Sequence, residues 1–298
     1  MRIFAPARFL DQSTQPHITT LIALASISAL AMNIFLPSLP SMAAYYNTTP
    51  SMMSLSVAIY LGASALLQLF SGPISDRIGR RPVILISLIL FIIASLATIW
   101  APNAETFLAL RFVQAFAATT MVLSRAVVRD TVGKEAAASK IAYVTMGMAV
   151  APMIGPGIGG YLDKYFGWQA IFALLAGLGL CIFILTWFDL GETAPKNKTS
   201  FSQQVIEYKQ LLKSQRFWGY CLASALGSGS FFIYLGGDPL WAPRYLVLHL
   251  NNSDFILARL PWVISLVITC RDVGLKSLGS TPWCLAALDS PVWDLPCH

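Results

Sequence analysis

Charged side chains are scarce in this sequence. Asp, Glu, Lys and Arg make up only 11% of its 298 residues, whereas hydrophobic residues make up 56%. Average soluble domains carry about 25% charged residues, and a soluble fold of this size could not bury so much apolar surface. The shortage of charge therefore argues against an ordinary soluble domain and predicts an all-α integral membrane protein.

Other common sites are missing as well. The five cysteines form no CxxC pair and have no zinc-like spacing with the three histidines, so we predict neither a metal site nor a disulfide framework. No P-loop occurs, so no ATP site and no cofactor is expected. The net charge is +6, and the basic residues that produce it lie between the apolar runs. It therefore indicates an anionic lipid bilayer surface as the partner, with no nucleic acid.

Six apolar runs are long enough to cross a bilayer, which takes about 20 residues. The first is too long for a cleavable signal peptide and follows a polar stretch, so we interpret it as an uncleaved helix. The six runs lie at about 18–38, 52–72, 82–101, 106–128, 138–161 and 167–189.

These runs divide the chain into five segments. A cytoplasmic N-terminal segment, 1–17, precedes a six-helix bundle, 18–189. A polar central loop follows at 190–216, and its second part has the pattern of an amphipathic surface helix. We predict a seventh transmembrane helix at 217–239 and an atypical tail at 240–298.

The basic residues indicate the orientation of the chain, because Lys and Arg collect in cytoplasmic loops. The opposite side of the first six helices offers only Lys164. We therefore expect a multi-pass protein whose N-terminus and central loop are cytoplasmic. The basic residues on that side are Arg2, Arg8, Arg77, Arg80, Arg81, Arg129, Lys134, Lys140, Lys196, Lys198, Lys209, Lys213 and Arg216.

The stretch SGPISDRIGRRPV, residues 71–83, concentrates charge in the turn between the second and third helices. Gly72 would let a helix end approach a neighbour, Gly79 would allow positive φ, and Pro82 suits the first position of the next helix. Asp76 is the only acid of the stretch, and its carboxylate can pair with an arginine that moves. We interpret this stretch as a cytoplasmic gating loop. Its arginines are Arg77, Arg80 and Arg81.

The fourth helix carries polar residues in LALRFVQAFAATTMVLSRAVVRD. Arg111 lies about five residues inside the helix, and Gln114 follows on the same face. An arginine within a membrane is a functional hypothesis by default, although snorkelling to the external interface is the alternative. A second cluster is predicted at the cytoplasmic end of this helix, formed by Arg125, Arg129 and Asp130.

The fifth helix carries small residues at every fourth position of GMAVAPMIGPGIGGYL. One face therefore has little side-chain bulk and permits very close helix packing. Two prolines remove backbone donors from the same helix and favour a kink. The residues of this motif are Gly147, Ala151, Pro152, Gly155, Pro156, Gly159 and Gly160.

These motifs together resemble the major facilitator superfamily of secondary transporters. Residues 71–83 are similar to its cytoplasmic signature loop. Residues 111–114 are similar to its RxxQG motif, which is linked with proton transfer. Ala115 stands where that motif usually has glycine. The proline–glycine face resembles the antiporter motif of the drug-efflux members.

The stretches AMNIFLPSLPSMAAYY, SRAVVRD and GWQAIF narrow the resemblance to the Bcr/CflA (bicyclomycin-resistance type) drug transporters, over about residues 15–240. The resemblance implies export of small hydrophobic molecules by proton antiport across the bacterial inner membrane, with alternating access. Asn33 stands where that family often has aspartate. The amide can hydrogen-bond a substrate, but it cannot titrate.

A complete member has two six-helix halves, whereas the predicted spans here supply one half and a seventh helix. We interpret the remainder as missing or altered, by truncation with a shifted reading frame after about residue 240; a short variant with a new tail is the alternative. Such a chain could be an inactive fragment that needs a second half. Asp76 would then find only local partners, such as Arg80 or Arg129.

Two further functions stay open on the sequence. One is a superfamily importer of a small metabolite, against which the proline–glycine face argues. The other is a membrane enzyme, for which no nucleophile–base pair stands out. The sequence favours a transporter over an enzyme.

The orientation can be tested with single cysteines in a variant that has no native cysteine. A membrane-impermeant maleimide applied to intact cells should label Lys164→Cys and leave Lys134→Cys unlabelled until the membrane is opened, because the two positions lie on opposite sides. Labelling of Lys134→Cys from outside would contradict the topology.

Overall fold

The computed structural model describes residues 9–12, 14–132, 134–194, 210–227 and 229. The chain divides into two units, 1–213 and 214–298. In the described part, every regular element is a helix. The all-α prediction is confirmed.

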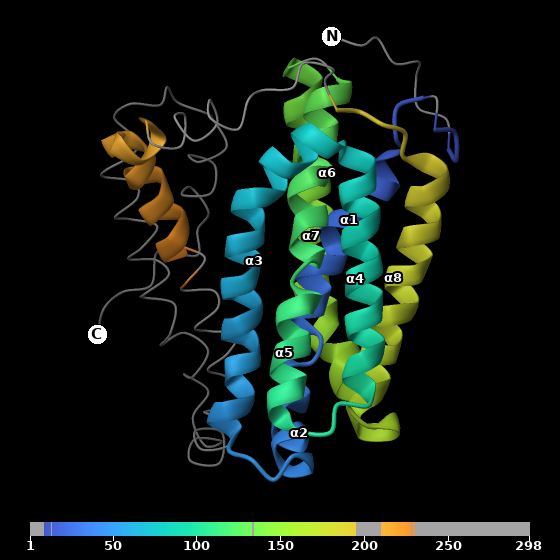
Figure 1. Cartoon of the computed structure of the whole chain (residues 1–298), viewed down its shortest axis with the longest axis vertical. Helices are drawn as coiled ribbons and strands as arrows, with labels where there is room; N and C mark the ends of the chain where they lie inside the picture. Colours follow the sequence, from blue (N-terminus) through green and yellow to red (C-terminus); the bar gives the residue numbers. More distant parts are fainter. Residues whose placement is uncertain (1–8, 13, 133, 195–209, 228, 230–298) are drawn as a thin grey trace, which may run out of the picture. The chain divides into compact units, whose positions relative to one another are not determined.

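Six helical spans in the first unit are long and apolar enough to cross a membrane, as the sequence predicts. Two are interrupted (Figure 1). The first consists of α1 (Ile18–Asn33), a short 3-10 turn η1 (Leu36–Ser38) and α2 (Leu39–Tyr45); the fourth consists of α5 (Ala104–Gln114) and α6 (Ala117–Thr131). The others are α3 (Pro50–Ile78), α4 (Arg80–Ile99), α7 (Lys134–Phe166) and α8 (Gln169–Asp189).

Several helix boundaries have local causes. Thr49 accepts a hydrogen bond from the Met52 amide and Pro50 begins α3, whereas Asn103 caps α5 by accepting from the Thr106 amide at 2.8 Å. Such caps satisfy amides that lack a partner in the first turn. Gly79 separates α3 from α4 with φ at 119°, as the sequence predicts.

The predicted loop 71–83 is mostly helical, which corrects three expectations. Helix α3 runs through Pro73 to Ile78, so only Gly79 lies between two helices. Helix α4 begins at Arg80, which places Pro82 at the third position instead of the first. No described atom lies within 4 Å of a β-carbon built on Gly72, so Gly72 does not serve a close approach here.

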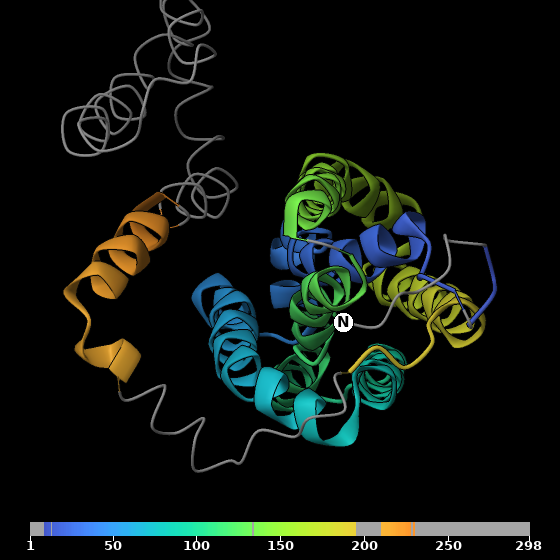
Figure 2. The same cartoon turned by 90° about the horizontal axis from the view of Figure 1, so that it is seen from above.

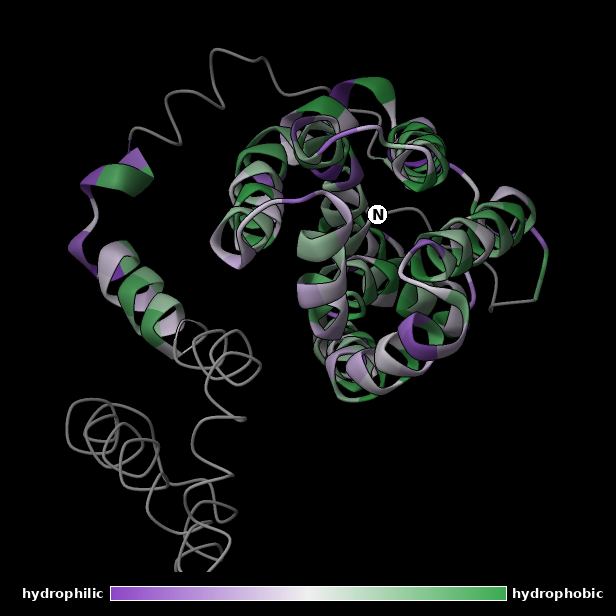
Figure 3. Ribbon diagram, turned by 90° about the horizontal axis from the view of Figure 1, so that it is seen from below, coloured by the Kyte–Doolittle hydropathy of each residue, from purple (hydrophilic) through white to green (hydrophobic). Residues whose placement is uncertain are grey.

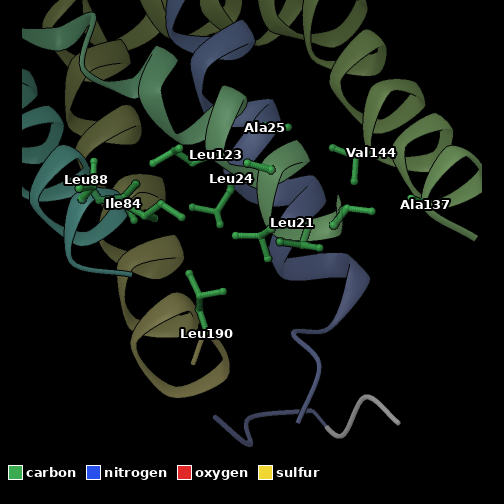
Figure 4. Packing of buried hydrophobic residues seen from close by; sticks show 13 residues of the cluster. Leu21, Leu24, Ala25, Ile84, Leu88, Leu123, Ala137, Val144 and Leu190 are labelled. Atoms are coloured by element: carbon green, nitrogen blue, oxygen red, sulfur yellow. The ribbon is translucent and has the colours of Figure 1, made fainter. Parts of the chain in front are cut away.

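One hydrophobic cluster joins the helices of the bundle (Figure 4). Leu21 and Leu24 of α1 pack with Ile84 of α4, Leu123 of α6 and Val144 of α7. Hydrophobic residues recur along the helices of the bundle (Figure 3), and many apolar side chains are exposed on its outside. Because a bundle in water would turn polar residues outward, the surface fits a lipid environment. Exposed apolar side chains include Leu66, Leu69, Ile86, Ile93, Met153 and Ile184.

The small-residue face of α7 packs against α1, which confirms the close approach predicted from its spacing. A β-carbon on Gly147 would collide with Ile22, and one on Gly159 with the carbonyl group of Ile34. At Gly155 the space is also tight, with Leu30 Cδ1 at 3.3 Å. Helix α7 continues as one helix through Pro152 and Pro156.

The second unit contributes a helix at 215–227. This helix overlaps the start of the predicted seventh span. The rest of that span, the central loop at 195–209 and the tail from 230 lie outside the described residues.

The α1–α7 contact can be tested with two glycines of the same helix. Gly159→Ala should destabilise the detergent-solubilised protein by about 1–3 kcal/mol, because the added methyl group overlaps backbone atoms of α1. Gly157→Ala is the matched control, because nothing described lies within 4 Å of its β-carbon. Thermal denaturation followed by fluorescence gel filtration would compare them. Equal stability of the two variants would contradict the packing.

Candidate functional site

Both interrupted spans are broken beside the side chain of Arg111. Helix α1 ends at Asn33 and helix α5 ends at Gln114, and Arg111 lies in the last turn of α5 with none of its surface exposed. The snorkelling alternative is therefore excluded, because a snorkelling guanidinium would reach solvent. A broken helix frees backbone groups, and such breaks commonly form transport sites in membrane proteins.

A chain of hydrogen bonds runs through Arg111 across three helices. Its Nη1 donates to the Ala31 carbonyl of α1 at 3.2 Å and to Gln114 Oε1 at 2.5 Å. Gln114 Nε2 in turn donates to Ser95 Oγ of α4 at 2.8 Å. The sequence predicted that Arg111 and Gln114 lie together, but it did not indicate Ala31 or Ser95 as partners.

Two aromatic rings enclose the guanidinium. The Arg111 Cζ atom lies 4.2 Å from the ring centre of Phe35 and 4.6 Å from that of Tyr60. Tyr60 is fixed by its own hydroxyl, which donates to the Ser28 carbonyl at 3.0 Å. Cation–π contacts of this kind stabilise a charge that has lost its water. No acid takes part in these contacts.

Some hydrogen-bonding capacity of the site is unused. Arg111 Nε and Nη2, and Asn33 Oδ1, are buried without a hydrogen-bond partner in the described part of the chain. Asn33 Nδ2 donates to the Ala29 carbonyl at 2.7 Å, so its amide is anchored at one end. Unpaired buried donors and acceptors are costly and are enriched at functional sites.

Ala115, which replaces the usual glycine of the motif, fits the local backbone. Its φ and ψ of −62° and −12° are ordinary helical values, and its side chain is buried. This position therefore does not need the positive φ that glycine allows.

A second group of polar contacts lies at the start of α4. Arg80 Nη2 pairs with Asp76 Oδ1 of α3 at 2.7 Å, and its Nε pairs with Asp130 Oδ2 of α6 at 3.0 Å. Its Nη1 donates to Ser75 Oγ. We call Asp76, Arg80 and Asp130 the charged clasp, because one guanidinium joins three helices. The predicted local pairing of Asp76 with Arg80 is confirmed.

The other arginines of these motifs do not join the charged clasp. Arg77 is exposed, and Arg81 donates to the Trp187 carbonyl at 3.0 Å. Arg129 is exposed, whereas Arg125 lies beside Met148 of α7 with Nη2 and Sδ 3.9 Å apart. Of the predicted cluster, Asp130 takes part in the charged clasp and Arg129 acts on it electrostatically, whereas Arg125 lies beside Met148.

Two acids that sequence analysis missed hold the ends of helices. Glu192 accepts from the amides of Arg80 at 2.8 Å and Arg81 at 3.3 Å, and so caps α4 after Gly79, which has no side chain. Asp189 is fully buried and accepts from the His17 amide at 2.9 Å and the Thr20 hydroxyl at 2.7 Å. Glu192 thus acts as an N-cap from 112 residues away, whereas Asp189 anchors the start of α1, where His17 is the N-cap residue.

Comparison with known proteins agrees with this geometry. The sequence pattern of the Major Facilitator Superfamily matches residues 21–274 of the chain. The chain belongs to the Major Facilitator Superfamily. The match continues past residue 240, and an alignment with one relative covers 83% of the chain. The limit that we predicted for the resemblance, at about residue 240, is therefore wrong.

The relatives include several resistance proteins. The chloramphenicol resistance protein of Pseudomonas aeruginosa is 35% identical over 257 residues, covering 83% of this chain and 59% of that protein. The bicyclomycin resistance protein homolog of Haemophilus influenzae is 32% identical over 229 residues, covering 76% and 58%. The multidrug transporter MdfA of Yersinia pestis is 31% identical over 231 residues, covering 76% and 56%.

These names confirm the predicted resemblance to drug-efflux members of the superfamily. The chain spans between half and two thirds of the length of each of these relatives. Among solved structures, the human organic anion transporter MFSD10 superposes with a TM-score of 0.51 at 20% identity, over 62% of this chain and 51% of that one. This likeness supports the fold.

The charged clasp can be tested by removing its central cation. Arg80→Gln removes the cation that pairs with two partly buried carboxylates and should lower the unfolding free energy by about 2 kcal/mol. Arg77→Gln, in the last turn of α3 and exposed, should change it by no more than about 0.5 kcal/mol. Thermal denaturation in detergent would compare them; an Arg80→Gln variant as stable as Arg77→Gln would show that the clasp adds nothing.

Proposed function

We propose that the chain forms part of a transporter that exports small hydrophobic drugs from the bacterial cytoplasm by proton antiport and alternating access. The observation that carries this proposal is the buried Arg111–Gln114 pair at two interrupted spans. Membership of a superfamily of transporters, with relatives named for drug resistance, supports it. The membrane-enzyme alternative is dropped, because the family is one of transporters.

The site offers a physical basis for coupling. Arg111 keeps two nitrogen atoms free of hydrogen bonds with described residues, and these can donate to water, to a substrate oxygen or to a carboxylate. Asn33 contributes a free carbonyl oxygen to the same region but cannot titrate. We therefore assign Arg111 and Gln114 to the coupling pathway as hydrogen-bonding groups that position water or a proton-carrying partner, since neither releases a proton itself, and substrate hydrogen bonding to Asn33.

The charged clasp would act as half of a gate on the cytoplasmic side. It joins the C-terminal ends of α3 and α6 to the N-terminal end of α4. Glu192, which follows α8, binds the first amide of α4. Rigid units of this kind are what alternating access requires, because one bundle rocks against another. The N-terminus would be cytoplasmic, since the basic residues collect at this end.

A second six-helix half is part of the proposal. The described unit supplies six spans, whereas transporters of this family place the substrate between two such halves. The relatives are longer than this chain, and the wall of the cavity opposite the described unit would come from a second half. An importer of a small metabolite is less well supported, because none of the three relatives described above carries such a name.

Drug accumulation in efflux-deficient cells tests this function. The 298-residue chain alone should not lower chloramphenicol accumulation, whereas its residues 1–216 fused to the second half of the Pseudomonas aeruginosa relative should lower it severalfold, in a way that a protonophore abolishes. Arg111→Ala in the fusion should remove this export while the protein stays in the membrane, and Lys164→Gln should keep it. Export by the chain alone, or by the Arg111→Ala fusion, would contradict the proposal.

A further inference from the structure

Helix α6 has one open face in the described unit. All its residues are buried except Met121, Val122, Arg125, Arg129 and Asp130. Met121, Arg125 and Arg129 recur every four residues, so they lie along one side of the helix. The open face of α6 therefore runs from Met121 to Arg129, in the part of the fourth span that follows the break at residues 115–116.

The guanidinium of Arg125 lies deep in the membrane. Side chains tilt toward the N-terminus of their helix, which for α6 is toward the middle of the span. The Nη2 atom lies 3.9 Å from Met148 Sδ, and Met148 is only three residues before residue 151, the midpoint of the span Ala136–Phe166. Arg125 therefore does not reach the cytoplasmic surface as Arg129 does.

No acid neutralises this charge in the described unit. The ion pairs of that unit involve Arg80 and not Arg125, and Arg125 Nε is buried without a hydrogen-bond partner there. The acids of the six spans and their ends lie near helix termini: Asp76, Glu105, Asp130, Glu135, Asp163 and Asp189. The middle of the unit therefore carries two cations, Arg111 and Arg125, and no anion.

A cation on an open helix face within the membrane cannot point at acyl chains at low cost, so it faces a water-filled cavity. The open face of α6 is therefore a cavity wall. Beside the charge lie the apolar side chains of Met121, Val122 and Met148. Flexible methionines adapt to different apolar ligands, whereas a fixed positive charge discriminates by sign.

We infer that Arg125 on the open face of α6 is a specificity-determining residue, which admits neutral or anionic apolar substrates and rejects lipophilic cations. This inference rests on the proposed transport function and names its substrate class. The reason is electrostatic: a second cation beside Arg125 would be repelled at short range in a medium of low dielectric constant. An anion would instead supply the counter-charge that the described unit lacks.

Two ions of the same shape test the sign of this selectivity. Tetraphenylborate and tetraphenylphosphonium have similar size and opposite charge, so binding of each to the full chain in lipid nanodiscs is measured and corrected with empty nanodiscs. The wild-type chain should bind tetraphenylborate at least about tenfold more tightly than tetraphenylphosphonium. Arg125→Gln should remove this preference, Arg125→Glu should reverse it, and Arg125→Lys should keep it.

Lys164→Gln is the control, because it removes one positive charge from the other end of the bundle and should leave the preference unchanged. Gel filtration would confirm that each variant remains folded, and Arg125→Lys separates a role of charge from a role in packing. Absence of binding above empty nanodiscs, a preference for the cation, or a preference that survives in Arg125→Gln would each overturn the inference.

The two proposals fail in different ways. If the fusion protein exports chloramphenicol but the chain prefers tetraphenylphosphonium, the selectivity inference is wrong and the transport function stands. If tetraphenylborate binding depends on Arg125 but no fusion exports a drug, the binding site stands and the transport function fails.

Discussion

The solvation of Arg111 is the constraint on which the centre of the bundle depends. A guanidinium without water must find hydrogen-bond acceptors and aromatic faces within the protein. Here they come from Ala31 of α1, Tyr60 of α3, Gln114 of α5 and Phe35 before η1. The Ala31 carbonyl, the Phe35 ring and Gln114 all lie close to breaks in their spans. The interruption of two helices and the burial of one charge therefore belong to a single arrangement, in which the breaks free the groups that hold the charge.

The same bundle uses charge differently at the end that carries the junction of α3 and α4. There Arg80 is held by two carboxylates and its backbone amide by a third, from Glu192. A cation that is paired with carboxylates, such as Arg80, fixes helix ends. Arg111 and Arg125 have no carboxylate partner in the described unit, so they can still bind another acceptor or an anion. Figure 2 shows how these ends gather when the bundle is viewed along its helices. Paired and unpaired arginines thus lie in different parts of the bundle.

Close packing of α1 against α7 makes both regions possible. The glycines of α7 admit the backbone of α1 at Ile34, immediately before Phe35, which lies against Arg111. Any bulk at Gly159 would displace this part of α1, and the aromatic contact would change with it. A motif that looks purely structural therefore also sets the geometry around the charge.

The sequence by itself determined the six spans, the small-residue face of α7 and the pairing of Arg111 with Gln114, because each depends on hydropathy, composition or spacing within one helix. It also indicated Asp76 with Arg80, which are four residues apart. The tertiary structure alone decided the roles of Ser95, Ala31, Asp189 and Glu192, and the separation of Arg125 from Asp130. These contacts join positions far apart in the chain, and they depend on which helix faces pack together; no local pattern carries that information. The helical course of residues 71–78 also escaped prediction, because Gly72 and Pro73 indicate a turn wherever packing does not override them.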